Sequence, residues 1–444
     1  MAHRGDSDRV TATYLEDFET LARNGGSRAP WLQDLRRAAL ERFRAVGFPT
    51  TREEDWRFNN LAPITTTPFR LAPAEVSGVA PEALAPFLYT IPGSSRLVFV
   101  NGRYAPALSA LGPLPDGVRL RNLSGAFASD GDLLTRHLGQ YARIDRNGFT
   151  ALNTAFVRDG ALLYVPAGVE LPGPIHVVFV TDRRADGAVT YPRNFYFLEP
   201  GARAAVIESY VSLGEFVAFT NAVTEAVVQA QAQLTHLKIQ RESEQAYHVG
   251  TTHFQQGRES QVHSHSVSLG AAICRNNLDL VLDGPGIESQ LLGLYMGRGT
   301  QEVDNHTFIL HAHPHCATRE VYKGILEGAS HGVFNGKVYV TPQAQKTDAK
   351  QTNRNLLLSD RARVDTKPQL EIFADDVKCT HGATVGSLDQ QAAFYLKTRG
   401  VGGPLARKIL TYAFAAEVLE EIPWEPVRTG LEQEVRGRLE EGGA

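Results

Sequence analysis

The 444-residue sequence predicts a mainly β protein with a parallel β-solenoid at its centre and helical segments at both ends. From about residue 95 to 386, short apolar runs alternate with Gly, Pro and Asp, which is typical of strands separated by turns. A loose repeat also occurs. Turn-type or small polar residues precede apolar runs, at intervals of 29, 27, 27, 29, 23 and 24 residues. The markers of this repeat are Gly201, Ala230, Gly257, Gly284, His313, Gly336 and Asp360. One solenoid coil with two or three short strands needs a repeat of this size.

The same short runs also fit an antiparallel β-sandwich. Such a sandwich needs tight hairpins, and the sequence offers Asn335-Gly336 as the one Asn-Gly pair that joins two strand-like runs. The pattern of the residues by itself therefore leaves the solenoid and the sandwich open.

The first segment, residues 1–94, is predicted to be helical with a connector. Apolar residues at helical spacing precede Gly47 and Pro49, which end the pattern. Thr50 and Glu53 have the spacing of a capping box and predict a second, short helix. The stretch 64–94 is rich in Pro, Thr and Ala and is expected to be a connector. The apolar positions of the first helix are Trp31, Leu32, Leu35, Ala38, Leu40 and Phe43.

The last segment, residues 387–444, is predicted to be helical. One helix has Pro404 in its first turn and ends before Pro423 and Pro426. A final, charged helix follows with apolar residues every four positions. The apolar face of the first helix carries Leu405, Ile409, Tyr412, Ala413, Ala416 and Leu419, and that of the second carries Val427, Leu431, Val435 and Leu439. The central β segment is therefore expected to span residues 95–386.

Composition argues against several classes of partner and compartment. The 45 basic and 49 acidic residues give a net charge of −4, whereas nucleic-acid binding requires a strong basic field. No apolar run is long enough to cross a membrane, and the polar start lacks a secretory signal. Three widely separated cysteines do not form a disulfide framework, so we expect a reducing, cytoplasmic location.

Motifs of common enzymes are missing from the sequence. It contains no phosphate-binding P-loop, dinucleotide loop, Gly-x-Ser-x-Gly elbow or Cys-x-x-Cys pair. This favours a scaffold over an enzyme.

Two groups of histidines are candidates for metal binding. His263 and His265 share one face of a predicted strand, as a metal-binding pair of histidines in a cupin-like enzyme would. His306, His311, His313 and His315 form a second group, although Pro314 disturbs strand geometry there. A structural role, with stacked or hydrogen-bonded imidazoles, is the preferred explanation of both groups. A metal-dependent, cupin-like enzyme using His263, His265 and His311 therefore remains an alternative.

Cys379 and His381 form a sharper candidate site. If the segment is a strand, both side chains point to one face and offer a thiol and an imidazole as ligands. Two ligands are too few for a closed site, because structural zinc and most clusters take four. Either the pair is inert, or another chain completes the site.

Further segments carry a family resemblance. The most specific is the seventeen-residue stretch 370–386, Leu-Glu-Ile-Phe-Ala-Asp-Asp-Val-Lys-Cys-Thr-His-Gly-Ala-Thr-Val-Gly. Shorter segments are Tyr322–Leu326, Phe334–Lys337, Asn355–Ser359, and Pro49-Thr50 with Glu54–Phe58 and Leu61. These motifs resemble the SufB/SufD family of scaffold subunits for iron–sulfur cluster assembly, in its SufD branch.

The resemblance implies a right-handed parallel β-helix between helical ends, in agreement with the repeat. It also implies a non-catalytic subunit that works with a SufB-like paralogue and a SufC-like ATPase. A homodimer in the absence of these partners stays open, as does a purely structural, partner-binding solenoid. The ATPase is expected to dock on the carboxy-terminal helices, here around Leu405, Ile409, Tyr412, Phe414 and Glu417.

The important Cys and His of the family fall on Cys379 and His381. No tightly bound cofactor is expected in the isolated chain, and iron or a nascent cluster would be held transiently in the complex. The sulfur-accepting Cys-Asp-Ser-Leu stretch of SufB-like chains corresponds here to Asn353-Arg354-Asn355-Leu356. The SufB-type Glu-His-Glu is replaced by Thr380-His381-Gly382, so the resemblance is to SufD and not to SufB.

Overall fold

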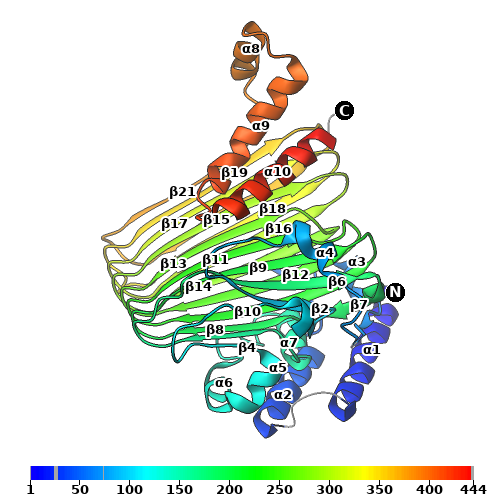
Figure 1. Ribbon diagram of the computed structural model, residues 1–444. Helices are drawn as coiled ribbons and strands as arrows, with labels where there is room; N and C mark the ends of the chain where they lie inside the picture. Colours follow the sequence, from blue (N-terminus) through cyan, green and yellow to red (C-terminus); the bar gives the residue numbers. More distant parts are fainter. Residues whose placement is uncertain (1, 25–28, 74, 442–444) are drawn as a thin grey trace.

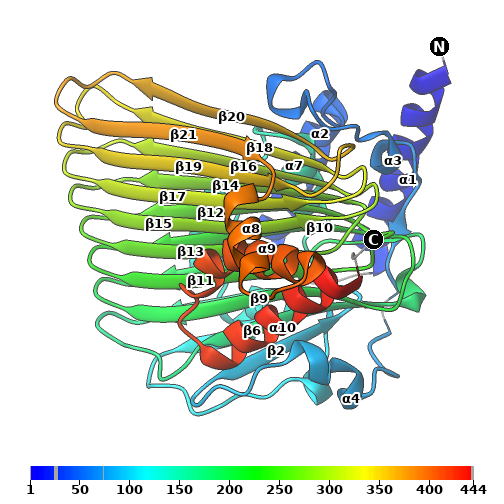
Figure 2. The ribbon, with the colours of Figure 1, turned by 90° about the horizontal axis from the view of Figure 1, so that it is seen from above.

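The computed structural model describes residues 2–24, 29–73 and 75–441. The chain winds into a parallel β-helix of eight coils, and each coil contributes one strand to each of two facing sheets (Figures 1 and 2). This confirms the predicted solenoid and excludes the antiparallel sandwich.

Sheet A has the strand order β20-β18-β16-β14-β12-β10-β8-β5-β4, and sheet B has the order β21-β19-β17-β15-β13-β11-β9-β6-β2-β3. The strands of sheet A are β4 (Arg119–Asn122), β5 (Ala161–Val165), β8 (Arg193–Leu198), β10 (Ala218–Val228), β12 (Tyr247–Gln256), β14 (Ile273–Leu282), β16 (Glu302–His311), β18 (His331–Val340) and β20 (Arg363–Ile372), with the short β1 (Arg70–Leu71) and β7 (Ala188–Thr190) off this path. The strands of sheet B are β2 (Ser95–Val100), β3 (Arg103–Tyr104), β6 (Ile175–Asp182), β9 (Arg203–Leu213), β11 (Gln233–Arg241), β13 (Gln261–Ser268), β15 (Glu288–Gly297), β17 (Ala317–Leu326), β19 (Asp348–Leu357) and β21 (Lys378–Gly386).

The turn at one edge of the helix follows the predicted repeat from Gly201 to His313. Backbone hydrogen bonds link successive turns there, from the Gly201 amide to the Ala230 carbonyl and onward. The last two markers were wrong: Gly336 lies inside β18, and Asp360 lies at the opposite edge, between β19 and β20. The coils also lengthen at this end, because the register step rises to 32 residues between His331 and Arg363.

The two sheets enclose a packed lumen. Inward-facing side chains from both sheets form one continuous hydrophobic cluster that runs from Leu97 to Ala374. Because alternate residues of a strand face opposite sides, the outward residues must be covered by other elements. The two helical ends of the chain provide this cover on different sheets.

The amino-terminal elements cover the outer face of sheet A. Trp56 and Phe149 pack with the outward Phe219 and Val249 of this sheet. The predicted first helix is confirmed as α2 (Pro30–Val46), which ends where Gly47 adopts φ +66° and its amide donates to the Phe43 carbonyl at 2.7 Å.

The other amino-terminal elements are shorter or were not predicted. The Thr50 amide donates to the Glu53 carboxylate at 2.9 Å, but a 3₁₀ turn follows in place of the predicted helix. Three helices lie within the segment 95–386, for which strands were predicted; two of them have only seven residues, too few for a clear helical period. The elements are α1 (Ala2–Asn24), η1 (Glu54–Trp56), α3 (Ala62–Thr65), α4 (Pro81–Leu84), η2 (Ala85–Phe87), η3 (Pro106–Leu108), α5 (Leu123–Ser129), α6 (Gly131–His137), α7 (Gly148–Ala155) and, later, η4 (Arg183–Ala185).

The carboxy-terminal helices lie on the outer face of sheet B (Figure 2). They are α8 (Gln390–Thr398), α9 (Gly403–Leu419) and α10 (Glu425–Glu441). Val418 and Leu431 pack there against Ile239 and Leu294 of the sheet. Helix α8 and the first half of α9 instead project beyond the sheet as an arm (Figure 1). No helix in the described ranges is long and apolar enough to span a bilayer.

Candidate functional site

The last strand of sheet B, β21, carries the Cys379–His381 pair. Within the described chain β21 pairs with β19 alone, so its other edge has no partner strand. Cys379 lies beside Ala349 and His381 beside Gln351 in this register. Cys379 packs against the lumen cluster, and His381 shares its face because it lies two residues further along the strand. The pair therefore lies at the open end of the lumen.

The surroundings of this pair make it an incomplete ligand set. Cys379 is half-buried and His381 is exposed. Burial raises the pKa of the Cys379 thiol, the Ala349 amide opposes this shift, and Asp348 adds to it. The thiol is therefore mostly protonated at neutral pH, and a metal would have to displace the proton. Among the described residues, no group of three or more His, Cys, Asp or Glu side chains could hold a metal.

A buried carboxylate and a buried amide line the same face beneath His381. Glu320 of β17 is in register with Gln351 of β19, and Gln351 is in register with His381. Gln351 Nε2 donates to Glu320 Oε2 at 2.7 Å, whereas Gln351 Oε1 has no hydrogen-bond partner in the described structure. Glu320 and Gln351 are 1% and 2% exposed. Burial raises the pKa of Glu320 to about 7, and the hydrogen bond from Gln351 opposes this shift.

Segments that carry the family resemblance meet in these last coils. Gly324 and Gly336 both leave room in the lumen: a Cβ at Gly324 would overlap Tyr295 and Asn355, and one at Gly336 would overlap Gln351. The Tyr295 hydroxyl donates to Asn355 Oδ1. The lumen beneath His381 is therefore polar and closely packed.

Sequence reasoning missed this polar lining. The signal was present, because Gln351, Asn353 and Asn355 occupy alternate positions of one strand, where an inward face would otherwise be apolar. Asn355 Nδ2 donates to Asn353 Oδ1 at 2.6 Å. The local pattern alone does not connect these residues with His381.

The three histidines of the cupin-like alternative do not come together. His263 and His265 lie on β13 of sheet B and share its outer face with Val267. His311 ends β16 of sheet A, is fully buried, and has its Nε2 3.0 Å from Thr318 Oγ1. A single metal ion cannot be bound by all three, so the structure does not support this alternative.

The other histidines of the second group lie in separate surroundings. His313 pairs with Asp283 at 3.3 Å on the surface, and His315 has φ +62° in the turn that follows β16. His306, which belongs to the same sequence group, has its Nε2 3.1 Å from Asp304 Oδ1. The separate aspartate contacts of His306 and His313 fit structural roles for these two side chains.

Two of the five residues predicted to bind a partner are exposed on the arm. The side chains of Leu405 and Ile409 are 55% and 40% exposed. Sequence reasoning did not include Phe394 and Tyr395 of α8, which are 68% and 57% exposed. The four side chains give the arm an exposed apolar surface.

Of the other three predicted partner residues, Phe414 and Glu417 contact the β-helix and Tyr412 contacts helix α10. Lys323 of β17 donates to the Phe414 carbonyl at 3.0 Å and pairs with Glu417. The Arg436 guanidinium lies 4.1 Å from the centre of the Tyr412 ring. Lys323, whose side chain is 1% exposed, therefore anchors the second half of α9 on sheet B.

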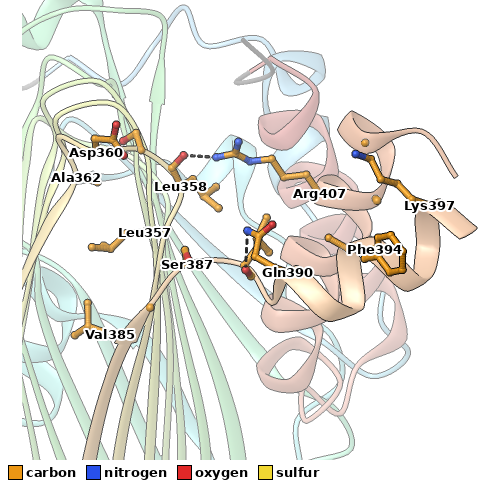
Figure 3. Close-up of a pocket in the computed structure, with 16 residues that line it drawn as sticks. Leu357, Leu358, Asp360, Ala362, Val385, Ser387, Gln390, Phe394, Lys397 and Arg407 are labelled. Atoms are coloured by element: carbon orange, nitrogen blue, oxygen red, sulfur yellow. Dashed lines mark hydrogen bonds between the residues drawn. The ribbon is translucent and has the colours of Figure 1, made fainter.

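A groove of about 850 Å³ separates the arm from the last coil (Figure 3). Leu358 and Val385 line it on the β-helix side, and Phe394 and Arg407 line it on the helical side. Arg407 donates to the Leu358 carbonyl across the groove. The arm is thus tied to the turn that leads from β19 to β20.

These features define a class of protein: a β-helix that ends in an open coil with an incomplete ligand pair, next to an exposed helical arm. The chain matches the family model of the SufBD protein N-terminal region over residues 10–177 and that of the SufBD core domain of the SUF system for FeS cluster assembly over residues 179–414. The chain therefore belongs to the SufBD family of iron–sulfur cluster assembly proteins.

Individual relatives agree with this family. The chain is 35% identical to an iron–sulfur cluster assembly SufBD family protein of Synechocystis, over 94% of both chains. It is 34% identical to the iron–sulfur cluster assembly protein SufD of Escherichia coli, over 94% of this chain and 93% of the relative. The identity to SufD of Bacillus subtilis is 28%, over 95% of this chain and 96% of the relative. The resemblance to SufD is thereby confirmed.

Proposed function

We propose that the chain is a non-catalytic subunit of a complex that assembles iron–sulfur clusters together with a SufB-like paralogue and a SufC-like ATPase. The observation that carries this proposal is the position of Cys379 and His381, which lie together at the open end of the lumen with no third ligand among the described residues. A ligand set of this kind suits a site that a second chain completes.

The open end also offers a docking surface. Strands β20 and β21 end their sheets and present backbone groups without a partner strand in the described chain. Such edges add strands from another chain readily. A paralogous β-helix placed end to end would supply the missing ligands, with His381 binding iron as a neutral imidazole and Cys379 as a thiolate that releases its proton.

The arm supplies a docking surface for the ATPase. Its exposed apolar side chains form the expected docking surface, and Lys323 fixes the other half of the same helix, α9, on sheet B. Motion of the docked ATPase is therefore transmitted to the last coils. Our hypothesis is that ATP-driven closing shifts the junction of the two β-helices and exposes Cys379 and His381.

Iron and the nascent cluster are cargo in this proposal, and the isolated chain holds no tightly bound cofactor. Sulfur is not accepted at the SufB-type position, because Asn353 and Asn355 occupy that strand and are buried in the lumen. A reducing cytosol suits Cys274 and Cys316, which are buried free thiols.

The test uses the chain co-expressed with its SufB-like and SufC-like partners. Iron and acid-labile sulfide are measured in the purified complex with His381→Ala, and size-exclusion chromatography checks that the complex persists. We expect the cluster to be lost from an intact complex. His263→Ala is the matched control, because His263 is exposed on the outer face of β13.

A His381→Ala complex with the cluster content of the wild type would refute the proposal and leave a purely structural solenoid. Loss of cluster in His263→Ala alone would instead favour a site on the outer face of sheet B.

A further inference from the structure

We propose that Glu320 and Gln351 form a relay that orients His381 toward iron. In this relay the Glu320 carboxylate fixes the Gln351 amide, and Gln351 Oε1 accepts a hydrogen bond from the N–H of the His381 imidazole. The inference rests on the proposed function and deepens it by naming two positioning residues of the same site.

The register of sheet B brings the three residues into one row. Glu320, Gln351 and His381 occupy directly adjacent positions on β17, β19 and β21. Glu320 and Gln351 face the lumen, where they are joined by the 2.7 Å hydrogen bond. His381 faces the same side, because Cys379, two residues before it, packs against the lumen cluster.

The orientation of the Gln351 amide follows from its partner. Gln351 Nε2 donates to Glu320 Oε2 at 2.7 Å, so the amide directs its Oε1 away from this carboxylate oxygen. Gly336 holds the amide in place from the other sheet, because its missing Cβ leaves the space that the Gln351 side chain occupies. Gln351 Oε1 is consequently a buried acceptor without a partner in the described structure. Such an atom costs free energy until a donor reaches it.

His381 is the donor that this acceptor lacks. A neutral imidazole has one N–H and one free nitrogen, and a metal-bound histidine usually donates its N–H to a fixed acceptor. Donation to Gln351 Oε1 would select one tautomer and fix the ring of an otherwise exposed side chain. The other nitrogen would then face the open end, where iron is expected.

The experiment uses the purified complex with both partners and Co²⁺ as an anaerobic spectroscopic probe of the iron site. Gln351→Leu should lower the Co²⁺ affinity about 10- to 100-fold, the usual effect of removing such a support. Glu320→Gln should cause a smaller loss, because the amide can then turn. The swapped double variant Glu320→Gln/Gln351→Glu keeps the hydrogen bond between the two positions and an acceptor for His381, so it should restore the affinity and the cobalt spectrum.

The matched control is Gln256→Leu, which removes a buried, inward amide of β12 that bonds to Ser260 and Ser289. This variant should bind Co²⁺ like the wild type. The rescue excludes a merely structural effect, since a misfolded coil would not regain the cobalt spectrum by exchanging two side chains.

Two results would overturn the relay: unchanged affinity in Gln351→Leu, or a swapped variant that folds and still binds as weakly as Gln351→Leu. His381→Ala separates this outcome from failure of the proposed function. If His381→Ala also binds Co²⁺ normally, the site itself is refuted; if it loses Co²⁺ while Gln351→Leu does not, the relay alone is refuted.

Discussion

Gly336 of β18 lies against the side-chain amide of Gln351 of β19. The amide occupies the space that a Cβ on residue 336 would need. A methyl group at this position would also meet the Phe334 ring, so the two sheets cannot both keep their packing. We expect Gly336→Ala to lower the free energy of unfolding by about 1–3 kcal/mol, the usual cost of overpacking a core. Urea unfolding at constant m-value measures this loss.

Gly382→Ala is the control for the effect of the methyl group itself. No atom lies within 4 Å of the position that its Cβ would take. The substitution should leave stability unchanged or raise it by up to about 1 kcal/mol, through the unfolded state. Equal destabilisation by both variants would show that the space around Gly336 is not the cause.

The amino-terminal Asp55-Trp56 motif is attached to the β-helix by a buried ion pair. Arg275 donates to Asp304 at 2.5 Å, to the Asp55 carbonyl at 2.9 Å and to Asn59 at 3.2 Å, and lies 4.0 Å from the Trp56 ring centre. Asp304→Ala would leave the guanidinium buried without its counter-charge. We expect a loss of about 3–5 kcal/mol, together with faster proteolysis of the amino-terminal segment.

A surface ion pair provides the comparison. Asp34 and Arg37 pair at 3.3 Å, with side chains 72% and 65% exposed. Asp34→Ala should change stability by less than about 1 kcal/mol. If Asp304→Ala costs no more than this, the Arg275 contact does not hold the two parts together.

The sequence predicted the solenoid where the coils are regular and failed where they are not. The turns from Gly201 to His313 are spaced 27 to 29 residues apart, because each coil there has nearly the same length. Gly336 was mistaken for a turn because a glycine can serve either a turn or a close contact, and here it serves Gln351. Local pattern cannot distinguish these two uses.

The candidate site was predictable only in part. Cys379 and His381 are two residues apart on one strand, so their shared face followed from the pattern. Glu320 and Gln351 join them through the register of neighbouring coils, which no local pattern contains. The exposed Phe394 and Tyr395 were missed because their exposure depends on how α8 projects from the body.

Stability should fall in acid through His311. Burial lowers the pKa of this side chain from 6.5 to about 4. Below pH 6.5 the His311 side chain is protonated in the unfolded chain but stays neutral in the folded chain. Stability is therefore lost progressively as the pH falls from 6.5 to about 4. The shift corresponds to a loss on the order of 3 kcal/mol. His311→Gln retains a polar partner for Thr318 and removes the titrating group, so its unfolding free energy should depend less on pH in this window.

The comparison must be made as a difference between the two proteins. Burial raises the pKa of Glu320 to about 7, so Glu320 contributes the opposite trend, and stability from this group is lost as the pH rises from 4.5 toward 7. Subtracting the wild-type curve from the His311→Gln curve cancels this contribution. A difference that stays constant between pH 6.5 and 4 would contradict the role of His311.

Docking of the ATPase should depend on the exposed apolar side chains of the arm. Leu405 and Ile409 are 55% and 40% exposed, so Leu405→Asp and Ile409→Asp should leave the fold intact. Each should weaken binding of a purified SufC-like ATPase about ten-fold or more, because a charge would be buried in an apolar contact. Isothermal titration calorimetry measures the affinity.

Val46→Asp is the matched control, since Val46 is 42% exposed on α2, on the amino-terminal side of the molecule. Its substitution should leave the affinity unchanged. Substitutions at Phe414 or Glu417 would answer a different question, because both contact Lys323 and would alter the anchor of α9 as well as any docking surface. Equal binding by all three variants would exclude the arm and direct attention to the end of the β-helix as the surface that receives the ATPase.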